Sequence, residues 1–203
     1  MKNLLRIKNF PRPIVFIGFL LFVANCNESI NPPIEQSPDY FPLELGNSWT
    51  YVPADTFYGL PFDWEITNRD DDTVTVTRQN QFGSHGGTIR ILDRGEEIDL
   101  ILNNQLVVPY YRFSVGSTWL HHDTWECDDT STYIAFAEKD QITTPAGTFS
   151  NCIRIERRGT IPCVDAGTLV EWWAPNVGLV RWDEENFYVG GPLTIYLKSY
   201  KLK

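Results

Sequence analysis

The stretch of residues 144–182, TPAGTFSNCIRIERRGTIPCVDAGTLVEWWAPNVGLVRW, contains the clearest turns and strands of the chain. Pro145-Ala146-Gly147 predicts a tight turn, because proline presets φ and glycine accepts a positive φ. Pro175-Asn176, followed by Gly178, predicts a second turn for the same reason. Apolar residues alternate on both sides of these turns, which is typical of strands that bury one face. The stretch therefore predicts antiparallel hairpins.

The same pattern continues over the rest of the chain after residue 40. Turn signals recur about every 8–12 residues, and no segment keeps a helical period over more than about ten residues. We therefore expect one all-β domain over residues 41–203, an antiparallel meander curled into a half-barrel or open barrel, with a β-sandwich as the alternative. The last run, residues 193–202, carries Lys198 and Lys201, which would suit the exposed edge of the sheet.

Two short segments resemble each other within this domain. They are Gly46-Asn47-Ser48-Trp49 and Gly116-Ser117-Thr118-Trp119, each preceded by aromatic residues. Both predict a turn at the glycine and then a strand that opens with a buried tryptophan. Two copies do not make a repeat protein, because a repeat unit needs several neighbours to bury its face.

The N-terminus has the features of a bacterial export signal. Residues 1–25 combine four basic residues with an eleven-residue apolar run, residues 14–24, which is too short to span a bilayer. Cys26 follows directly in a context that resembles a lipobox, although Asn25 stands where a small residue is usual. We predict that residues 1–25 are a signal peptide of the lipoprotein type and that Cys26 is lipidated, the alternative being a plain secretory signal. Residues 26–40 are polar and rich in proline, which predicts a flexible tether.

The charge of the mature chain restricts its partners. After residue 25 the chain has 13 basic and 26 acidic residues, a formal charge of −13. This charge argues against nucleic acid as a partner, because binding to phosphates needs basic patches. It also argues against attraction to anionic lipids, so we expect contact with the membrane through the N-terminal lipid. The expected location is the bacterial cell envelope, at the outer membrane, on its periplasmic or its surface face.

Three cysteines remain after Cys26, and an odd number leaves at least one thiol free. If the turn at Ala146 centres one long hairpin, Arg157 lies opposite Ala135. The same pairing, continued outward, brings Cys127 within two positions of Cys163. We therefore predict a disulfide between Cys127 and Cys163 and a free Cys152. A bond between Cys152 and Cys163 and three reduced thiols are the alternatives.

The densest group of possible metal ligands is the run HHDTWEC at residues 121–127. A structural zinc site needs four converging ligands, whereas His121 and Asp123 supply two on one face. We predict no metal, and a polar strand instead. The sequence also lacks G-x-S-x-G and H-E-x-x-H motifs, so we expect no catalysis and no cofactor.

Seven tryptophans and nine tyrosines favour a binding protein. Trp172 and Trp173 are adjacent, so on a strand they point to opposite faces, and one of them should lie on an outer or ligand-binding face. We take this pair as the candidate binding surface. The predicted function is binding of an apolar ligand or an envelope partner on a concave, aromatic-lined sheet. A carboxylate-dependent hydrolase and a structural or assembly component of the envelope are the alternatives.

The motifs PAGTF-x-x-C-I-x-I-E at residues 145–156 and EWWAP-x-VGLVR at residues 171–181 resemble a group of bacterial envelope proteins. The group includes the DUF3108-like and TapB-like families, and the GNSW and GSTW segments are similar to those proteins as well. This resemblance implies an antiparallel half-barrel related in shape to the LolA/LolB lipoprotein carriers. It implies no catalytic residues.

Overall fold

The structure, a computed structural model, describes residues 37–55, 60–80, 87–102, 106–122, 130–159, 168–186 and 191–203. Every regular element within these ranges is a β-strand, and they contain no apolar helix long enough to cross a membrane. The strands are β1 (Ser48–Pro53), β2 (Phe62–Asp70), β3 (Thr73–Asn80), β4 (Gly87–Asp93), β5 (Glu97–Ile101), β6 (Val107–Arg112), β7 (Thr118–His122), β8 (Thr130–Ala137), β9 (Ile142–Thr144), β10 (Gly147–Phe149), β11 (Ile153–Gly159), β12 (Leu169–Ala174), β13 (Gly178–Asn186) and β14 (Gly191–Lys201).

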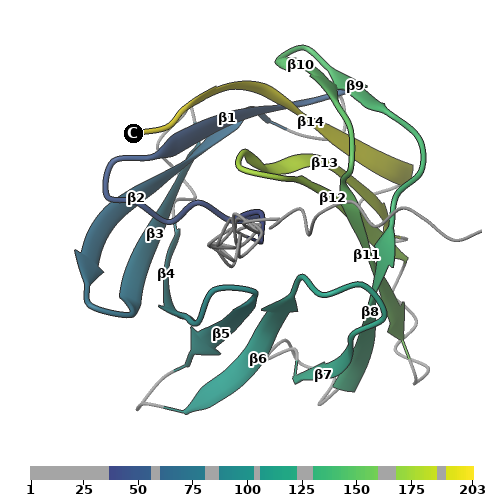
Figure 1. Cartoon of the computed structure of the whole chain (residues 1–203). Coiled ribbons are helices and arrows are strands. Elements are labelled where there is room, and N and C mark those ends of the chain that lie inside the picture. Colours follow the sequence, from purple (N-terminus) through teal and green to yellow (C-terminus); the bar gives the residue numbers. More distant parts are fainter. Residues whose placement is uncertain are drawn as a thin grey trace, which may run out of the picture. The chain divides into compact units, whose positions relative to one another are not determined.

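Twelve of these strands form one antiparallel sheet in the order β6-β5-β4-β3-β2-β1-β14-β13-β12-β11-β8-β7, and β9 and β10 form a separate hairpin. The first strand pairs with the last, so the sheet curls back on itself (Figure 1). The ends of the strand order, β6 and β7, share no backbone ladder over their described residues. The predicted open barrel is therefore confirmed, as a nearly closed barrel with one seam between β6 and β7.

The curvature of the sheet has an identifiable cause. The pairing shifts by one residue at four places, between β1 and β14, β2 and β3, β5 and β6, and β12 and β13. Such β-bulges bend a strand and increase its twist, and both effects close a sheet toward a barrel. The alternating burial of β1, in which Trp49 and Tyr51 are each 1% exposed, shows which face is inward.

The prediction that the last strand lies at an edge is wrong. Strand β14 lies between β1 and β13 and pairs with both of them. Its exposed Lys198 is the residue skipped at the bulge between β1 and β14. The outer face of a curled sheet meets solvent along its whole length, so lysines on that face give no information about edges.

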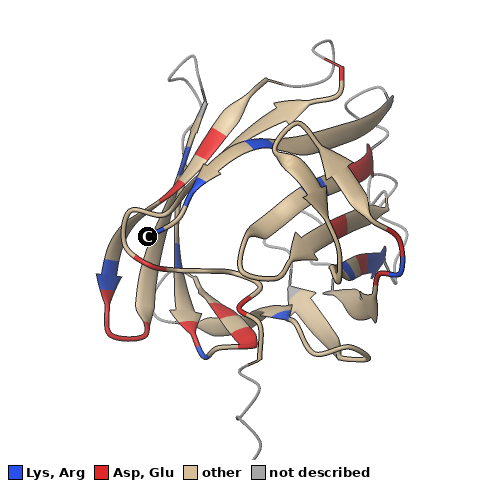
Figure 2. Ribbon diagram, turned by 45° about the horizontal axis from the view of Figure 1, so that its top comes forward, with Lys and Arg blue, Asp and Glu red and all other residues tan. Residues whose placement is uncertain are grey.

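The turns follow the sequence closely. Residues 70–72 form the acidic turn between β2 and β3, the red loop in Figure 2, with Asp71 at a φ of 49°. The β12–β13 turn places Asn176 at a φ of 58° and Gly178 at 112°. A side chain at Gly178 would meet the indole nitrogen of Trp49 at 3.0 Å, so this glycine also permits a close approach.

The predicted pairing across the turn at Ala146 is wrong by two positions. Strand β11 pairs Arg157 with Tyr133 of β8, rather than with Ala135. The cause is that β9 and β10 form a hairpin of their own, and Asn151, at a φ of 56°, interrupts the strand between β10 and β11. A shift of two residues keeps each side chain on its predicted face.

The two similar segments have the same structure. Gly46 and Gly116 have φ values of 86° and 87°, and each donates its N–H to a neighbouring strand, to the carbonyls of Ile66 and Ala135. Three residues later, Trp49 and Trp119 are buried, with 1% and 6% of their surfaces exposed. The prediction of a glycine turn followed by a buried tryptophan is confirmed in both copies.

Side chains join the seam between β6 and β7. The indole nitrogen of Trp119 donates to the carbonyl of Tyr110 at 3.1 Å, and Nδ1 of His121 lies 2.8 Å from the carbonyl of Pro109. A carbonyl only accepts, so Nδ1 of His121 carries the proton. Pro109 has no N–H to give to a ladder, which is consistent with its place on an outermost strand.

Candidate functional site

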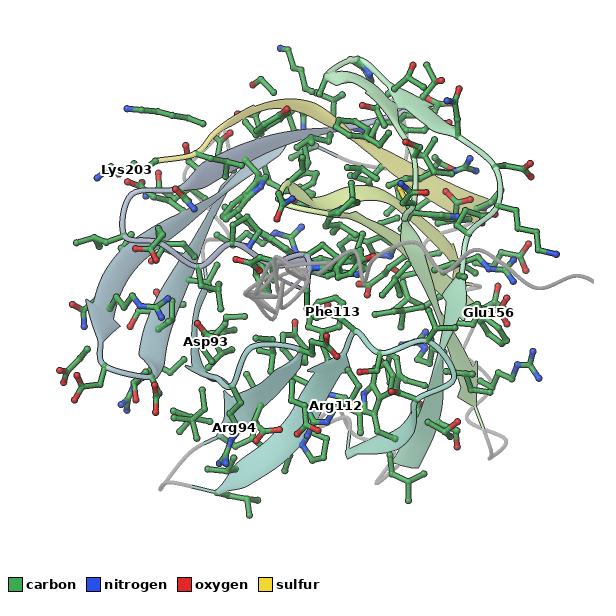
Figure 3. All side chains as sticks on the ribbon, in the orientation of Figure 1. Asp93, Arg94, Arg112, Phe113, Glu156 and Lys203 are labelled. Carbon is green, nitrogen blue, oxygen red and sulfur yellow. The ribbon has the colours of Figure 1, made fainter. Side chains whose placement is uncertain are left out.

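Six aromatic rings meet inside the barrel, and we call them the aromatic cluster: Phe41, Trp49, Trp64, Tyr111, Phe113 and Trp173. Phe41 is their common neighbour, with its ring centroid 5.0 Å from that of Trp173 and 5.9 Å from that of Trp49. Phe113 points into the barrel from the turn after β6 (Figure 3). Most of the rings are tilted or edge-on to one another, and Tyr111 and Phe113 are stacked. Aromatic quadrupoles favour edge-on and offset-stacked pairs.

Phe41 does not come from the sheet. It belongs to residues 37–47, which precede β1 and run across the inside of the barrel ring (Figure 1). The backbone of Asp39 is held by Asn176, which donates its N–H to the Asp39 carbonyl at 2.6 Å. The side chain of Asn47 donates to the carbonyl of Pro42 at 2.9 Å. The interior of the barrel therefore accommodates two apolar side chains of this segment, Phe41 and Leu43, which are 4% and 2% exposed.

A buried carboxyl group lies beside this cluster. Glu171 of β12 is 5% exposed, and its two oxygens accept hydrogen bonds from the hydroxyl of Tyr111 at 3.1 Å and the indole nitrogen of Trp173 at 3.2 Å. Burial raises the pKa of Glu171 to about 7, because the two hydrogen bonds and the charge of Arg157 only partly offset the loss of hydration. The carboxyl is thus half-protonated near neutral pH.

Trp172 and Trp173 point to opposite faces of β12, as predicted. Trp173 is fully buried in the aromatic cluster, and Trp172 on the other face is 9% exposed. Trp172 lies between Arg154 of β11 and Arg181 of β13, its direct partners in the ladders, and the Arg181 guanidinium is 4.7 Å from its ring centroid. Other side chains of the protein therefore cover both tryptophans, and their role in ligand binding stays a prediction.

The indole N–H of Trp172 also has a hydrogen-bond partner. Its indole nitrogen donates to Oε2 of Glu138 at 2.9 Å, and Glu138 also accepts hydrogen bonds from the N–H groups of Lys139 and Asp140. These bonds, together with Arg154, lower the pKa of Glu138 although its burial opposes the shift. This network fixes the connection between β8 and β9 against the outer face of the barrel.

The cysteine predictions are resolved in part. Cys152 is free and 2% exposed, as expected of a thiol outside the predicted bond, and burial raises its pKa to about 11. Cys26, Cys127 and Cys163 lie outside the described residues.

The disulfide between Cys127 and Cys163 stays a prediction, because both cysteines lie outside the described residues. The described ladder between β8 and β11 ends at Gly159 opposite Ser131. We expect unreduced peptide mapping of the exported protein to recover one peptide that joins these two cysteines and a second that contains Cys152 as a free thiol. Recovery of all three thiols free, or of Cys152 in the bond, would contradict the prediction.

The structure describes only part of the run of possible metal ligands at residues 121–127. His121 lies in the barrel wall, 8% exposed and bonded to the carbonyl of Pro109, whereas residues 123–127 lie outside the described part. Within the described residues, no group of three or more histidines, cysteines or acids is placed to hold a metal ion.

A shallow groove of about 380 Å³ lies on the outer face of β1, β2 and β3. Its lining includes Ser48, Thr50, Asp63, Glu65, Thr77, Gln79 and Lys201. These polar and charged side chains do not match an apolar ligand, so the interior is the better candidate for the predicted function.

The fold and the interior define a class of protein, an antiparallel β-barrel over the described residues whose interior contains a cluster of aromatic side chains. The DUF3108-like family model matches residues 133–194, from β8 into β14, which confirms the DUF3108-like part of the resemblance over that range. Two solved structures are similar to the chain. One is a lipoprotein candidate from Parabacteroides distasonis, 18% identical over 81% of this chain and 99% of the other, with a TM-score of 0.49. The second is an exported-protein candidate with a YmcC-like fold from Bacteroides fragilis, 16% identical over 82% and 100%, with a TM-score of 0.49. No curated protein matches the chain.

Two central residues of the site were not identified from the sequence. Phe41 stands directly after the segment predicted to be a tether, and no local pattern places it among tryptophans that lie far away in the chain. Glu171 could have been found, because it alternates with Leu169 and Trp173 and so occupies an inward position of the predicted strand. An acidic residue in such a position is unusual unless it is partnered.

Proposed function

We propose that the protein is a lipid-anchored, non-catalytic protein of the bacterial cell envelope that binds an apolar ligand through its aromatic cluster. The observation that carries the binding role is Phe41. A ring from outside the sheet fills the space between Trp49, Trp173 and their neighbours, so the aromatic cluster in the barrel interior has the chemistry to hold an apolar group. A ligand would compete with the segment that contains Phe41, or would bind beside it.

The anchoring role rests on the N-terminal sequence. A basic segment, a short apolar run and Cys26 occur in the order of a lipoprotein signal. The polar residues that follow would separate the lipid from the folded domain. The DUF3108-like match is consistent with a protein of this kind.

Replacing the proposed lipidation site tests the anchor directly. We expect the wild-type chain, expressed with its own N-terminus in a bacterium, to be recovered from membranes, with its mature N-terminal peptide carrying lipid on Cys26. We expect Cys26→Ser to yield a chain without lipid that is released by gentle lysis. An unmodified wild-type chain that begins at another residue would contradict the anchor.

The ligand is tested by a native mass spectrum of the protein purified from its own envelope without denaturant. We propose that the spectrum contains a bound apolar molecule that organic extraction removes, and that the stripped protein takes up a fluorescent apolar probe. The control variant is Leu60→Ala, which removes an exposed side chain away from the aromatic cluster. It should bind the probe as well as the wild type does. A protein that carries no ligand and takes up no probe would overturn the binding role.

One observation favours the second candidate, a carboxylate-dependent hydrolase. A carboxyl group with a pKa of about 7 could act as a general acid near neutral pH. However, both oxygens of Glu171 already accept hydrogen bonds inside the core, which favours a structural role. Turnover of ester or glycoside substrates by the wild type that is lost in Glu171→Gln would establish the hydrolase and overturn the non-catalytic function.

A further inference from the structure

The exposed apolar side chains of the described residues are unevenly distributed. Seven large apolar residues have more than two-fifths of their surface exposed, and four of these belong to the seam between β6 and β7: Leu106, Val107, Val115 and Leu120. Leu106 directly precedes β6, Val107 is its first residue, Val115 lies in the turn before β7, and Leu120 lies on the outward face of β7. We call these four residues the seam patch.

Strands β6, β7 and β8 carry almost no charge. Strands β7 and β8 contain no aspartate, glutamate, lysine or arginine, and β6 contains only Arg112, at its end. These strands are therefore tan in Figure 2 apart from that residue. The neighbours of Leu120 on the outward face of β8 include the half-buried Thr132 and Ile134. Strand β5, the other neighbour of β6, carries Glu97 and Asp99, which are paired with Arg112, and Glu96 lies beside the turn that contains Val115. An apolar area on strands with so little charge, in a chain with a strongly acidic mature sequence, indicates a contact surface.

The seam is closed to an added strand. The bonds from Trp119 to the Tyr110 carbonyl and from His121 to the Pro109 carbonyl cross the gap between the two strand edges. A strand from a partner would have to break both bonds before it could pair with either edge. The seam patch is therefore available on its outer surface, and its partner must be recognised by apolar contact rather than by backbone pairing.

The described chain begins beside the same seam. Ser37 donates its hydroxyl to Glu96, and the other oxygen of Glu96 accepts a hydrogen bond at 2.5 Å from Ser114, the neighbour of Val115. The ring of Tyr40 stacks on Phe113 of the same turn at 5.7 Å. Ten residues, 27–36, lie between Cys26 and this point, so they reach at most about 35 Å. A lipid on Cys26 would thus hold the bilayer within about 35 Å of this end of the seam.

We propose that the seam patch docks the barrel on the phospholipid bilayer, with Leu106, Val107, Val115 and Leu120 facing the lipid. The inference rests on the proposed lipid anchor at Cys26. The contact is apolar and carries no cluster of basic residues, so it needs no anionic lipid. Tethering raises the effective concentration of the membrane, so that a weak apolar contact suffices once the lipid is inserted.

Hydrogen exchange of the lipidated protein tests the docking. The full mature chain is placed on nanodiscs of zwitterionic phosphatidylcholine and compared with the Cys26→Ser chain in solution. We expect peptides from β6 and β7 to exchange at least about tenfold more slowly on the nanodisc, with little change in β2 and β3. The double variant Leu106→Glu/Leu120→Glu, lipidated in the same way, should lose this protection. Its exposed positions leave the fold intact, which circular dichroism verifies.

The control is the double variant Leu45→Glu/Leu60→Glu, which places the same charges at exposed positions away from the seam patch. It should keep the wild-type protection. If β6 and β7 of the lipidated chain on nanodiscs exchange as fast as those of the Cys26→Ser chain in solution, the docking is overturned and the anchor stays intact. Protection that appears without membrane and grows with protein concentration overturns it in favour of a second copy, and protection that requires another envelope protein overturns it in favour of that partner. A chain without lipid on Cys26 overturns the anchor and the docking together.

Discussion

In the wild-type chain, we expect the titration of Glu171 to lower the unfolding free energy by about 3 kcal/mol as pH rises from about 4.5 to about 7. We expect Glu171→Gln to abolish this decrease. Glu171 is buried, and its pKa is raised from 4.5 to about 7. Between these values the folded chain holds a proton that the unfolded chain has released. The stabilisation is therefore complete below about pH 4.5 and is lost as pH rises through about 7.

The groups that surround Glu171 from neighbouring strands set the size of this effect. Tyr111 of β6 and Trp173 of β12 donate hydrogen bonds that favour the charged form, and Arg157 of β11 acts in the same direction. Glu184 of β13 opposes them, and burial outweighs them all. A glutamine at position 171 keeps an oxygen that can accept a hydrogen bond but does not titrate.

The measurement is urea unfolding of both chains at intervals from about pH 4 to about pH 8. The difference between their unfolding free energies isolates Glu171, because the other carboxyl groups are common to both. Glu138→Gln is the matched control with the opposite sign. The pKa of Glu138 is lowered, so its contribution is present above the usual glutamate pKa and is lost as pH falls. Parallel curves for wild type and Glu171→Gln would show that Glu171 titrates normally in the folded chain.

Phe41→Ala is expected to lower the unfolding free energy by about 3–5 kcal/mol, the range for loss of a buried phenylalanine. Phe41 is 4% exposed and contacts the rings of Trp49, Trp64, Tyr111 and Trp173. Its removal leaves a cavity lined by these rings. If the aromatic cluster binds apolar ligands, the same variant should take up more of a fluorescent apolar probe than the wild type.

Leu45→Ala is the control, because Leu45 is 48% exposed in the same N-terminal segment and should change stability by no more than about 0.5 kcal/mol. If Phe41→Ala fails to fold, Phe41→Leu keeps most of the volume and should be milder. A stability loss without any gain in probe uptake would assign Phe41 to the core alone. A variant as stable as the wild type would show that the segment before β1 does not occupy the barrel.

Local patterns in the sequence predicted the local features of the fold. The glycine turns before Trp49 and Trp119 and the turn at Asn176 follow from residue chemistry over a few positions, and all three are present. The opposite orientation of Trp172 and Trp173 follows in the same way from the two-residue period of a strand.

Long-range features could not be predicted from the sequence, because they depend on how the sheet closes. The partner predicted for Arg157 lies two residues from the observed one, because no pattern in the sequence distinguishes the separate β9–β10 hairpin. The pairing of β14 with β1 could not be inferred from lysines, and the position of Phe41 depends on that closure. The burial of Trp172 likewise comes from Arg181 and Glu138, which belong to other strands and connections.

The pairing of β1 with β14 also constrains when this protein can fold. The first strand of the domain obtains its second partner only after the last strand exists, and the N–H of Lys203 then donates to the side chain of Asn47 at 2.9 Å. Contacts so distant in sequence form slowly. The ring therefore cannot close until β14 has been synthesised. A chain that must cross a membrane unfolded would benefit from this delay, and loss of even the final strand would leave β1 as an unpaired edge.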